Sequence, residues 1–203
     1  MALFNQEMAP VVAQFCAEHP DVQLSLLTYH NVEIESLLVH GELELAIIPH
    51  GTLLARNPLL TTEVLCQRRW HLVLAADHPL ARKRRLKPAD LVRYPWVLGN
   101  PERNAWARAV MSGLAQAGVL DQLQVSVRID DSMTACHLAA LGLGLTVSPY
   151  RPYLPADAPA RVRPINDLFP TDHLVALWRR GVSLRPTARR FLDFVRRAMS
   201  RAS

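Results

Sequence analysis

Cysteine, aromatic residues and long apolar runs are all scarce in this sequence of 203 residues. The three cysteines lack Cys-x-x-Cys spacing, so we expect small buried side chains in a reducing cytosol rather than disulfides or metal ligands. The longest apolar runs, 71–76 and 138–147, fall far short of the roughly 20 residues of a membrane-spanning helix. The first residues carry no charged region leading into an apolar one. We therefore expect a soluble, unexported, cytoplasmic protein with no membrane partner.

The net charge of +5 raises the question of a nucleic-acid partner. The basic residues concentrate in Arg82-Lys83-Arg84-Arg85 and in 185–201, and aromatic residues are only 6 % of the chain. The two aromatic residues within 185–201, Phe191 and Phe194, are expected to dock the last helix on the core rather than to serve as stacking platforms. One interpretation is a solvated loop and a solvated helix face, and the other is a patch that contacts phosphates. We expect the first, because base-stacking side chains are missing.

Motifs of catalysis and of metal binding are also missing. The sequence has no His-Glu-x-x-His, no Gly-x-Ser-x-Gly and no phosphate-binding loop of the Walker type. Gly142-Leu143-Gly144 is only a fragment of a dinucleotide fingerprint, since the third glycine is missing and a helix precedes it. Asp130 and Asp131 are adjacent, so an extended chain points them to opposite faces, and capping a helix is the commoner role for such residues. We predict no catalytic residue, no metal and no cofactor.

Hydrophobic periodicity predicts alternating helices and strands, with no internal repeat. Glycines at 41, 118 and 142 are placed to end helices, and 149–170 has the composition of a loop. We expect an α/β fold whose sheet is parallel at its centre. The expected strands are 22–26, 45–48, 63–66, 71–75, 96–98, 125–129, 145–147 and 173–178. The expected helices are one that begins near Phe4 and is stopped by His19-Pro20, then 32–40, 88–93, 105–117, one ending near Gly142, and one following Pro186.

Four segments, in this order and spacing, resemble the effector-binding domain of the LysR-type transcriptional regulators. They are 10–22, 37–48, 72–81 and 138–149, with a weaker fifth over 174–186. The resemblance implies the type 2 periplasmic-binding-protein-like fold, in which two crossover strands join two α/β subdomains with a ligand cleft between them. The expected division is 1–76 with 172–203 for subdomain I, whose first strand is not in the sequence, and 77–171 for subdomain II.

The resemblance also implies partners. Full-length members carry an N-terminal winged helix-turn-helix and a linker helix, bind DNA through that helix-turn-helix, and form dimers and tetramers. This sequence contains neither element, so we expect a fragment or a reading frame that starts internally, which forms a homo-oligomer and has no sequence-specific DNA affinity of its own.

Polar residues at element ends are the candidate effector contacts. The resemblance places Asn31 at the start of the second helix, and Asn100 with Pro101 on a loop after a strand. It places 132–134 at the start of the helix that faces them. Helix N-termini offer unpaired N–H groups and a favourable dipole to an anion, so a small carboxylate or other anion is the expected effector. The full predicted set is Asn31, Pro49, Asn100, Pro101, Ser132, Met133, Thr134 and Ser148.

Three other functions remain open at this point. A solute-binding protein of a transporter has the same fold, but it should carry an export signal. An enzyme on this fold would turn over a substrate. A stand-alone modulator would pair with a full-length regulator through the shared dimer interface.

Overall fold

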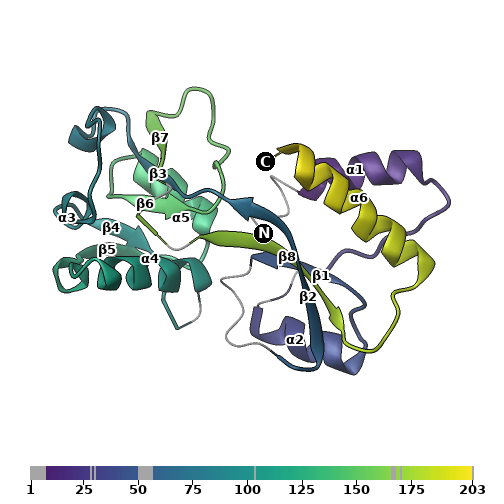
Figure 1. The fold of residues 1–203 in the computed structure, drawn as a ribbon. Coiled ribbons are helices and arrows are strands. Elements are labelled where there is room, and N and C mark those ends of the chain that lie inside the picture. The colour runs from purple at the N-terminus through teal and green to yellow at the C-terminus, as the bar shows by residue number, and fades with distance from the viewer. Residues whose placement is uncertain are drawn as a thin grey trace. The chain divides into compact units, whose positions relative to one another are not determined.

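The computed structural model describes residues 8–27, 29, 31–49, 57–102, 104–165, 168–169 and 171–202. The chain forms two compact units (Figure 1). Unit 1 contains the described residues up to Gln67 and those from His173 onward, and unit 2 is Arg68–Asp172. The division at 76/77 and 171/172 that we expect from the sequence stays a prediction. None of the described helices is long and apolar enough to cross a membrane.

Unit 1 contains a three-stranded sheet in the order β1-β8-β2. Its strands are β1 (Ala46–Pro49), β2 (Leu60–Arg68) and β8 (Asp172–Arg179). Strand β1 pairs with β8 in antiparallel register, Ala46 opposite Leu177 and Pro49 opposite Leu174. The expectation of a parallel sheet is therefore wrong for this pair, because β1 pairs with a strand from the far end of the chain rather than with a sequence neighbour.

The helices of unit 1 are α1 (Ala9–Glu18), α2 (Asn31–His40) and α6 (Pro186–Ala202). Helices α1 and α6 pack together through edge-to-face rings, with Phe15 centred 5.1 Å from Phe191 and 5.4 Å from Phe194. Offset and edge-to-face pairs of this kind add about 0.5–1.5 kcal/mol to the burial of the rings. Helix α2 buries Leu38 in a second apolar cluster of this unit. Cys16, which we expected to be buried, is exposed because its neighbour Phe15 takes the inward face of α1.

The helix that we expect His19-Pro20 to stop has its start outside the described residues, and its observed end at Glu18 agrees with the prediction. Another local prediction in unit 1 fails. The alternation over 22–26 does not make a strand among the described residues. Val22 and Leu24 pack against the core, whereas Leu26 is 46 % exposed. Only the start of this segment therefore lies against the apolar core.

Unit 2 is built on β3 (His71–Ala75), which pairs antiparallel with β6 (Thr146–Ser148) on one side and with β7 (Ala160–Pro164) on the other. Strands β4 (Trp96–Leu98) and β5 (Val125–Arg128) pair in parallel, as the sequence predicted for the centre of the sheet. A parallel bridge from Trp96 to Leu145 joins β4 to the start of β6. Strand β7 lies in the segment that we expected to be a loop. Local patterns do not indicate this strand, because prolines flank it and its partner β3 is distant in sequence.

Three helices of unit 2 follow the predicted pattern: α3 (Pro88–Leu91), α4 (Ala105–Gln116) and α5 (Ser132–Ala140). The short 3-10 helices η3 (Pro79–Ala81) and η4 (Leu120–Gln122) were not predicted. Gly118 and Gly142 follow α4 and α5 with φ of 70° and 87°, the left-handed conformation that ends a helix. Side chains of α3, α4 and the strands bury Trp96, Leu98 and Leu114 completely in one core.

Candidate functional site

The candidate site lies where three strands of unit 2 end. Strands β4, β5 and β6 run in the same direction, since Trp96 pairs in parallel with both Val125 and Leu145. Their carboxyl ends therefore open at one edge, the position where α/β sheets bind ligands. Six of the predicted residues lie at these strand ends or after them: Asn100, Pro101, Ser132, Met133, Thr134 and Ser148.

The loop after β4 is held against the loop after β5. The Asn100 amide donates to the Asp130 carboxylate over 3.3 Å, and the Asn104 side-chain amide donates to the Asp130 carbonyl oxygen over 2.8 Å. The Asn100 side-chain oxygen accepts from the amide of Glu102 over 3.0 Å. Hydrogen bonds across the two loops thus fix the geometry of this edge before any ligand arrives.

Asp131 caps helix α5. One oxygen of its carboxylate accepts from the backbone amide of Thr134 and from the Thr134 hydroxyl, each over 2.8 Å. This is the N-cap arrangement in which an aspartate satisfies an otherwise unpaired amide of the first turn. The Thr134 hydroxyl proton is therefore directed to Asp131 in this structure.

Ser132, the first residue of α5, shares a hydrogen bond of 2.6 Å with the hydroxyl of Tyr150. Burial raises the pKa of Tyr150 to about 12, so its hydroxyl stays protonated at neutral pH. One bond uses one of the two hydroxyl protons, which leaves the other for a ligand. The start of α5 and the chain after β6 thus present a paired hydroxyl donor.

A buried charge pair adjoins this hydroxyl pair. Arg68 lies 3.8 Å from Asp172, and their side chains are only 3 % and 6 % exposed. The guanidinium carbon of Arg68 lies 5.1 Å from the centre of the Tyr150 ring, within cation–π range. Arg68 ends β2 and Asp172 begins β8, so the pair sits on the two strands that connect unit 2 to unit 1.

The structure places the eight predicted residues in two groups. The six of unit 2 share the edge just described, although Ser148 is fully buried and its oxygen accepts from the Tyr150 amide over 3.4 Å. In unit 1, Pro49 ends β1 and Asn31 begins α2, with the side chain of Asn31 outside what the structure describes.

Sequence reasoning missed Tyr150, Arg68 and Asp172. Tyr150 carried a weak signal, because it comes two residues after Ser148 at the end of a buried strand. Arg68 and Asp172 carried none, since a charged residue at a strand end is usually solvated. The sequence could have identified Asp131, rather than Asp130, as the capping residue, because Asp131 lies three residues before Thr134.

The described residues contain no group of three or more His, Cys, Asp or Glu side chains that could hold a metal ion. Burial raises the pKa of the Cys136 thiol to about 12, so it is a core side chain rather than a nucleophile. The chemistry of the candidate site is therefore hydrogen bonding and charge, supplied by hydroxyl groups, amides and ion pairs.

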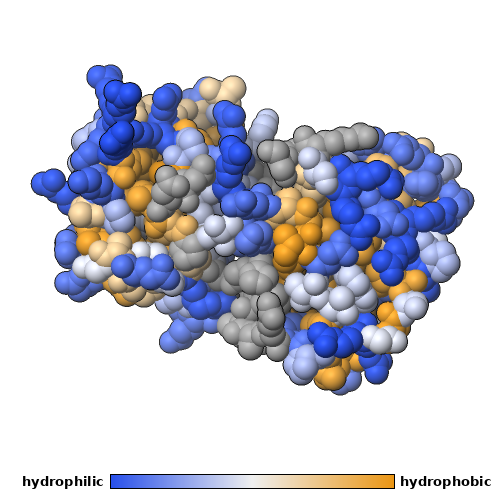
Figure 2. Space-filling model, viewed as in Figure 1, coloured by the Kyte–Doolittle hydropathy of each residue, from blue (hydrophilic) through white to orange (hydrophobic). Residues whose placement is uncertain are grey.

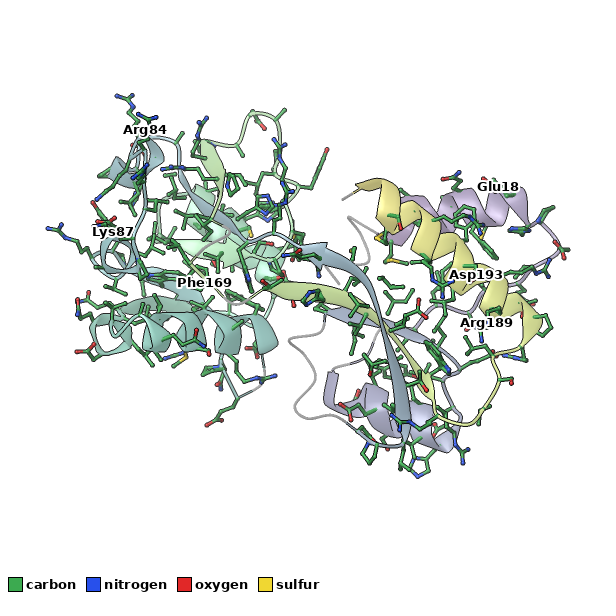
Figure 3. All side chains as sticks on the ribbon, in the orientation of Figure 1. Glu18, Arg84, Lys87, Phe169, Arg189 and Asp193 are labelled. Carbon is green, nitrogen blue, oxygen red and sulfur yellow. The ribbon has the colours of Figure 1, made fainter. Side chains whose placement is uncertain are left out.

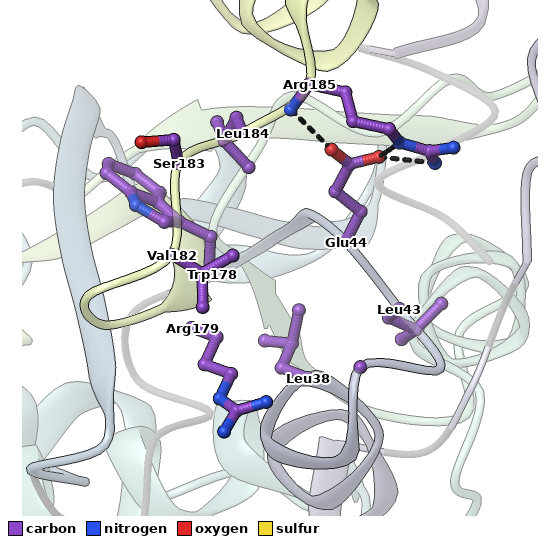
Figure 4. A pocket seen from close by; sticks show the side chains of 10 residues that line it. Leu38, Leu43, Glu44, Trp178, Arg179, Val182, Ser183, Leu184 and Arg185 are labelled. Atoms are coloured by element: carbon purple, nitrogen blue, oxygen red, sulfur yellow. Dashed lines mark hydrogen bonds and ion pairs between the residues drawn. The ribbon is translucent and has the colours of Figure 1, made fainter.

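A separate pocket of about 380 Å³ lies in unit 1 between α2, the end of β8 and the start of α6 (Figure 4). Its wall combines Leu38, Trp178 and Leu184 with the Glu44–Arg185 ion pair. It adjoins the start of β1, whereas the predicted contact Pro49 ends that strand about 10 Å away. The pocket is therefore not part of the predicted effector site.

Glu44 provides a pH test of this region. Its carboxylate accepts from the Arg185 amide and from Arg185 Nε, each over 2.7 Å, and the side-chain bond holds the pKa of Glu44 below its usual 4.5. A lowered carboxyl pKa stabilises the fold above about pH 4.5, and this contribution is lost as the pH falls through the folded-state pKa. We expect Glu44→Gln to lower the free energy of unfolding at pH 7 by at most about 1 kcal/mol.

The difference between the variant and the parent chain should shrink steadily as the pH falls below 4.5. Urea unfolding at pH 7, 5, 4 and 3 measures it, and Glu42→Gln, an exposed neighbour, is the control. A difference that stays constant over this range would mean that the charge of Glu44 contributes nothing.

Two α/β units joined by paired crossover strands define the class of the protein as a type 2 periplasmic-binding-protein-like domain, and solved structures agree. A C-terminal domain of a probable LysR family transcriptional regulator from Rhodococcus sp. RHA1 superposes with a TM-score of 0.82 at 28 % identity, covering 96 % of this chain and 94 % of that chain. The family model of the LysR substrate binding domain matches residues 2–200. The chain belongs to that family.

Further comparisons find similarity to transcriptional regulators. The Hca operon transcriptional activator HcaR of Escherichia coli (strain K12) is 25 % identical over 198 residues, 94 % of this chain and 62 % of HcaR. The chain thus spans less than two thirds of that relative. The effector binding domain of QuiR in complex with shikimate has a TM-score of 0.81 at 17 % identity, covering 98 % of this chain and 93 % of that one. The Synechocystis PCC6803 CcmR regulatory domain in complex with 2-PG has a TM-score of 0.82 at 16 % identity, with coverage of 98 % and 93 %.

Proposed function

We propose that this chain is the effector-sensing module of a LysR-type transcriptional regulator and that it binds a small anionic metabolite without catalysis. The observation that carries the proposal is the convergence of the Asn100 loop, the start of α5 and Tyr150 at the carboxyl ends of parallel strands. The remaining predicted contacts, Asn31 and Pro49, belong to the proposal through the family resemblance. QuiR and CcmR, whose structures hold shikimate and 2-PG, support a small carboxylate or phosphorylated ligand.

The charges of the edge refine the chemistry of the ligand. The first turn of α5 and the hydroxyl pair favour a negative group. Asp130 and Asp131 are exposed carboxylates on the same edge, and they would repel a second negative group. We therefore propose an effector with one anionic group directed to Ser132 and hydroxyl or amine donors directed to Asp130, such as a hydroxy acid.

Ser132→Ala tests the proposal, because it removes the hydroxyl that faces the ligand and leaves the Asp131 cap in place. We expect affinity to fall about tenfold, the loss of one hydrogen bond to a charged group, with little change in melting temperature. A thermal-shift screen of small carboxylates that includes shikimate and 2-PG selects the ligand. Calorimetric titration then measures the dissociation constant.

Thr134→Val is the companion variant, because valine keeps the shape and removes a hydroxyl. Since that hydroxyl donates to Asp131, we expect a smaller loss of affinity than for Ser132→Ala, with some loss of stability from the weakened cap. Unchanged affinity in Ser132→Ala removes Ser132 from the site. If the chain converted any ligand of the screen into a product, it would be an enzyme, and the proposal of a sensor without catalysis would be wrong.

A further inference from the structure

A group of arginine side chains in unit 2 makes no contact that stabilises the fold. Arg82, Arg84 and Arg85 lie between η3 and α3 and are exposed, and none of their side chains has a hydrogen bond or ion pair with the described residues. Their neighbour Lys83 differs, since it donates to Asp90 over 2.6 Å. Figure 3 shows Arg84 and Lys87 pointing outward from this end of the unit.

A fourth arginine reaches the same surface from β7. Arg161 and Arg163 occupy alternate positions of that strand, opposite Leu74 and Leu72, and therefore share one face of the sheet. The Arg163 guanidinium donates to the carbonyl oxygen of Leu80 in η3, which places this face beside the segment that follows η3. Arg161 is exposed and, among the described residues, unpaired. We call Arg82, Arg84, Arg85 and Arg161 the arginine surface.

The other basic segment of the chain is partly neutralised by ion pairs. On α6 and the residue before it, Arg185 pairs with Glu44, Arg196 with both Glu63 and Asp193, and Arg190 lies 3.8 Å from Asp21. Two further arginines of α6, Arg189 and Arg197, are exposed and have no ion pair with the described residues. On the arginine surface the nearby Asp90 is already engaged by Lys83, and Asp77 and Asp157 leave a positive excess. A larger share of the arginines is therefore without an acidic partner on the arginine surface than on α6.

The surroundings of the arginine surface indicate the kind of partner. Large exposed apolar side chains occur elsewhere on the described chain, but none lies in 77–93 or on β7. Protein interfaces are anchored by buried apolar and aromatic side chains, and membrane-binding surfaces insert them, so both are disfavoured here. Single strands need stacking aromatics, which are also absent from these segments. Figure 2 shows hydrophilic residues covering the corresponding corner of the molecule.

We propose that the arginine surface binds the phosphate backbone of double-stranded DNA, without sequence preference. Guanidinium groups match phosphate oxygens in bidentate geometry, and several exposed arginines in one segment can each neutralise a phosphate. The contact is independent of the effector site, because it uses none of the residues at the ends of β4, β5 and β6. The arginine surface thus gives electrostatic affinity for a DNA duplex to a module whose proposed function is to bind a small ligand.

Fluorescence anisotropy with a 20-base-pair duplex of random sequence tests the proposal at 50–200 mM NaCl. We expect the triple variant Arg82→Gln, Arg84→Gln, Arg85→Gln to bind at least tenfold more weakly at 50 mM NaCl. The slope of log K against log salt should fall by about 2 to 3, since each lost phosphate contact removes about 0.9.

The matched control changes the net charge equally on α6, as Arg189→Gln, Arg190→Gln, Arg197→Gln, and should retain nearly all the affinity. Thermal melting of both variants checks that each is folded. Equal losses in the two variants would mean that net charge alone drives binding, and absence of binding by the parent chain at 50 mM NaCl would end the proposal. Preferential binding to single strands, heparin or anionic vesicles would also overturn it.

Discussion

Replacing Gly144 by alanine is expected to lower the free energy of unfolding by about 3 kcal/mol or more, because the glycine combines an unusual backbone with no space for a side chain. Its φ of 152° lies in the region that only glycine adopts readily. A Cβ atom there would lie 2.6 Å from the Pro95 carbonyl oxygen. That oxygen cannot move away easily, since it accepts the Leu145 amide over 2.8 Å where β6 joins β4.

Gly142→Ala is the matched control. Gly142 also has a positive φ, of 87°, but a Cβ atom there meets nothing within 4 Å. We expect it to cost about 1 kcal/mol, the strain of a left-handed residue without a clash. Urea unfolding followed by circular dichroism measures both variants. Equal losses of stability in the two variants would mean that the backbone around Pro95 relaxes. The short distance to the Pro95 carbonyl oxygen would then not explain why residue 144 is a glycine.

Replacing Asp172 by asparagine is expected to have an effect of similar size, about 3–5 kcal/mol, because it removes the negative charge beside a buried guanidinium. Arg68 and Asp172 are almost completely shielded from water, so solvent cannot replace the lost partner. The contact of Arg68 with the Tyr150 ring compensates only in part, since cation–π contacts contribute about 2 kcal/mol when desolvated.

The double variant Arg68→Met, Asp172→Leu tests whether the loss comes from the unbalanced charge. Replacing both partners by apolar residues of similar volume should recover most of the stability that Asp172→Asn loses, because no buried charge remains. Chemical denaturation of the single and double variants gives the comparison. A double variant as unstable as Asp172→Asn would mean that the unbalanced charge does not cause the loss.

The Ser132–Tyr150 contact links these residues to the proposed effector site. Arg68 packs on the ring of Tyr150, whose hydroxyl bonds to Ser132 at the start of α5. A change at Asp172 should therefore also alter effector affinity, whereas Gly144→Ala should act mainly on stability. Calorimetry on the folded fraction of each variant separates the two effects.

Local patterns were sufficient to predict most of the elements of unit 2. The helix from Ser132, its end near Gly142 and the strand from Thr146 depend on contacts between close sequence neighbours, and the structure has all three. Strand β7 could not be found this way, because its partner β3 lies far away in the sequence and prolines flank it. The opposite error occurred at 22–26, where alternation is present but no described strand pairs with it.

The sequence by itself determined the α/β class, the family resemblance and the grouping of Asn100 and Ser132 at helix and strand ends, since these follow from short-range periodicity and from the order of segments. Only the tertiary structure decided which polar groups meet. The Arg68–Asp172 pair joins opposite ends of unit 2, and the bond from Ser132 to Tyr150 forms because β6 returns beside β4. Such contacts depend on how strands are ordered in space, and strand order is set by burial of the whole core rather than by any local pattern.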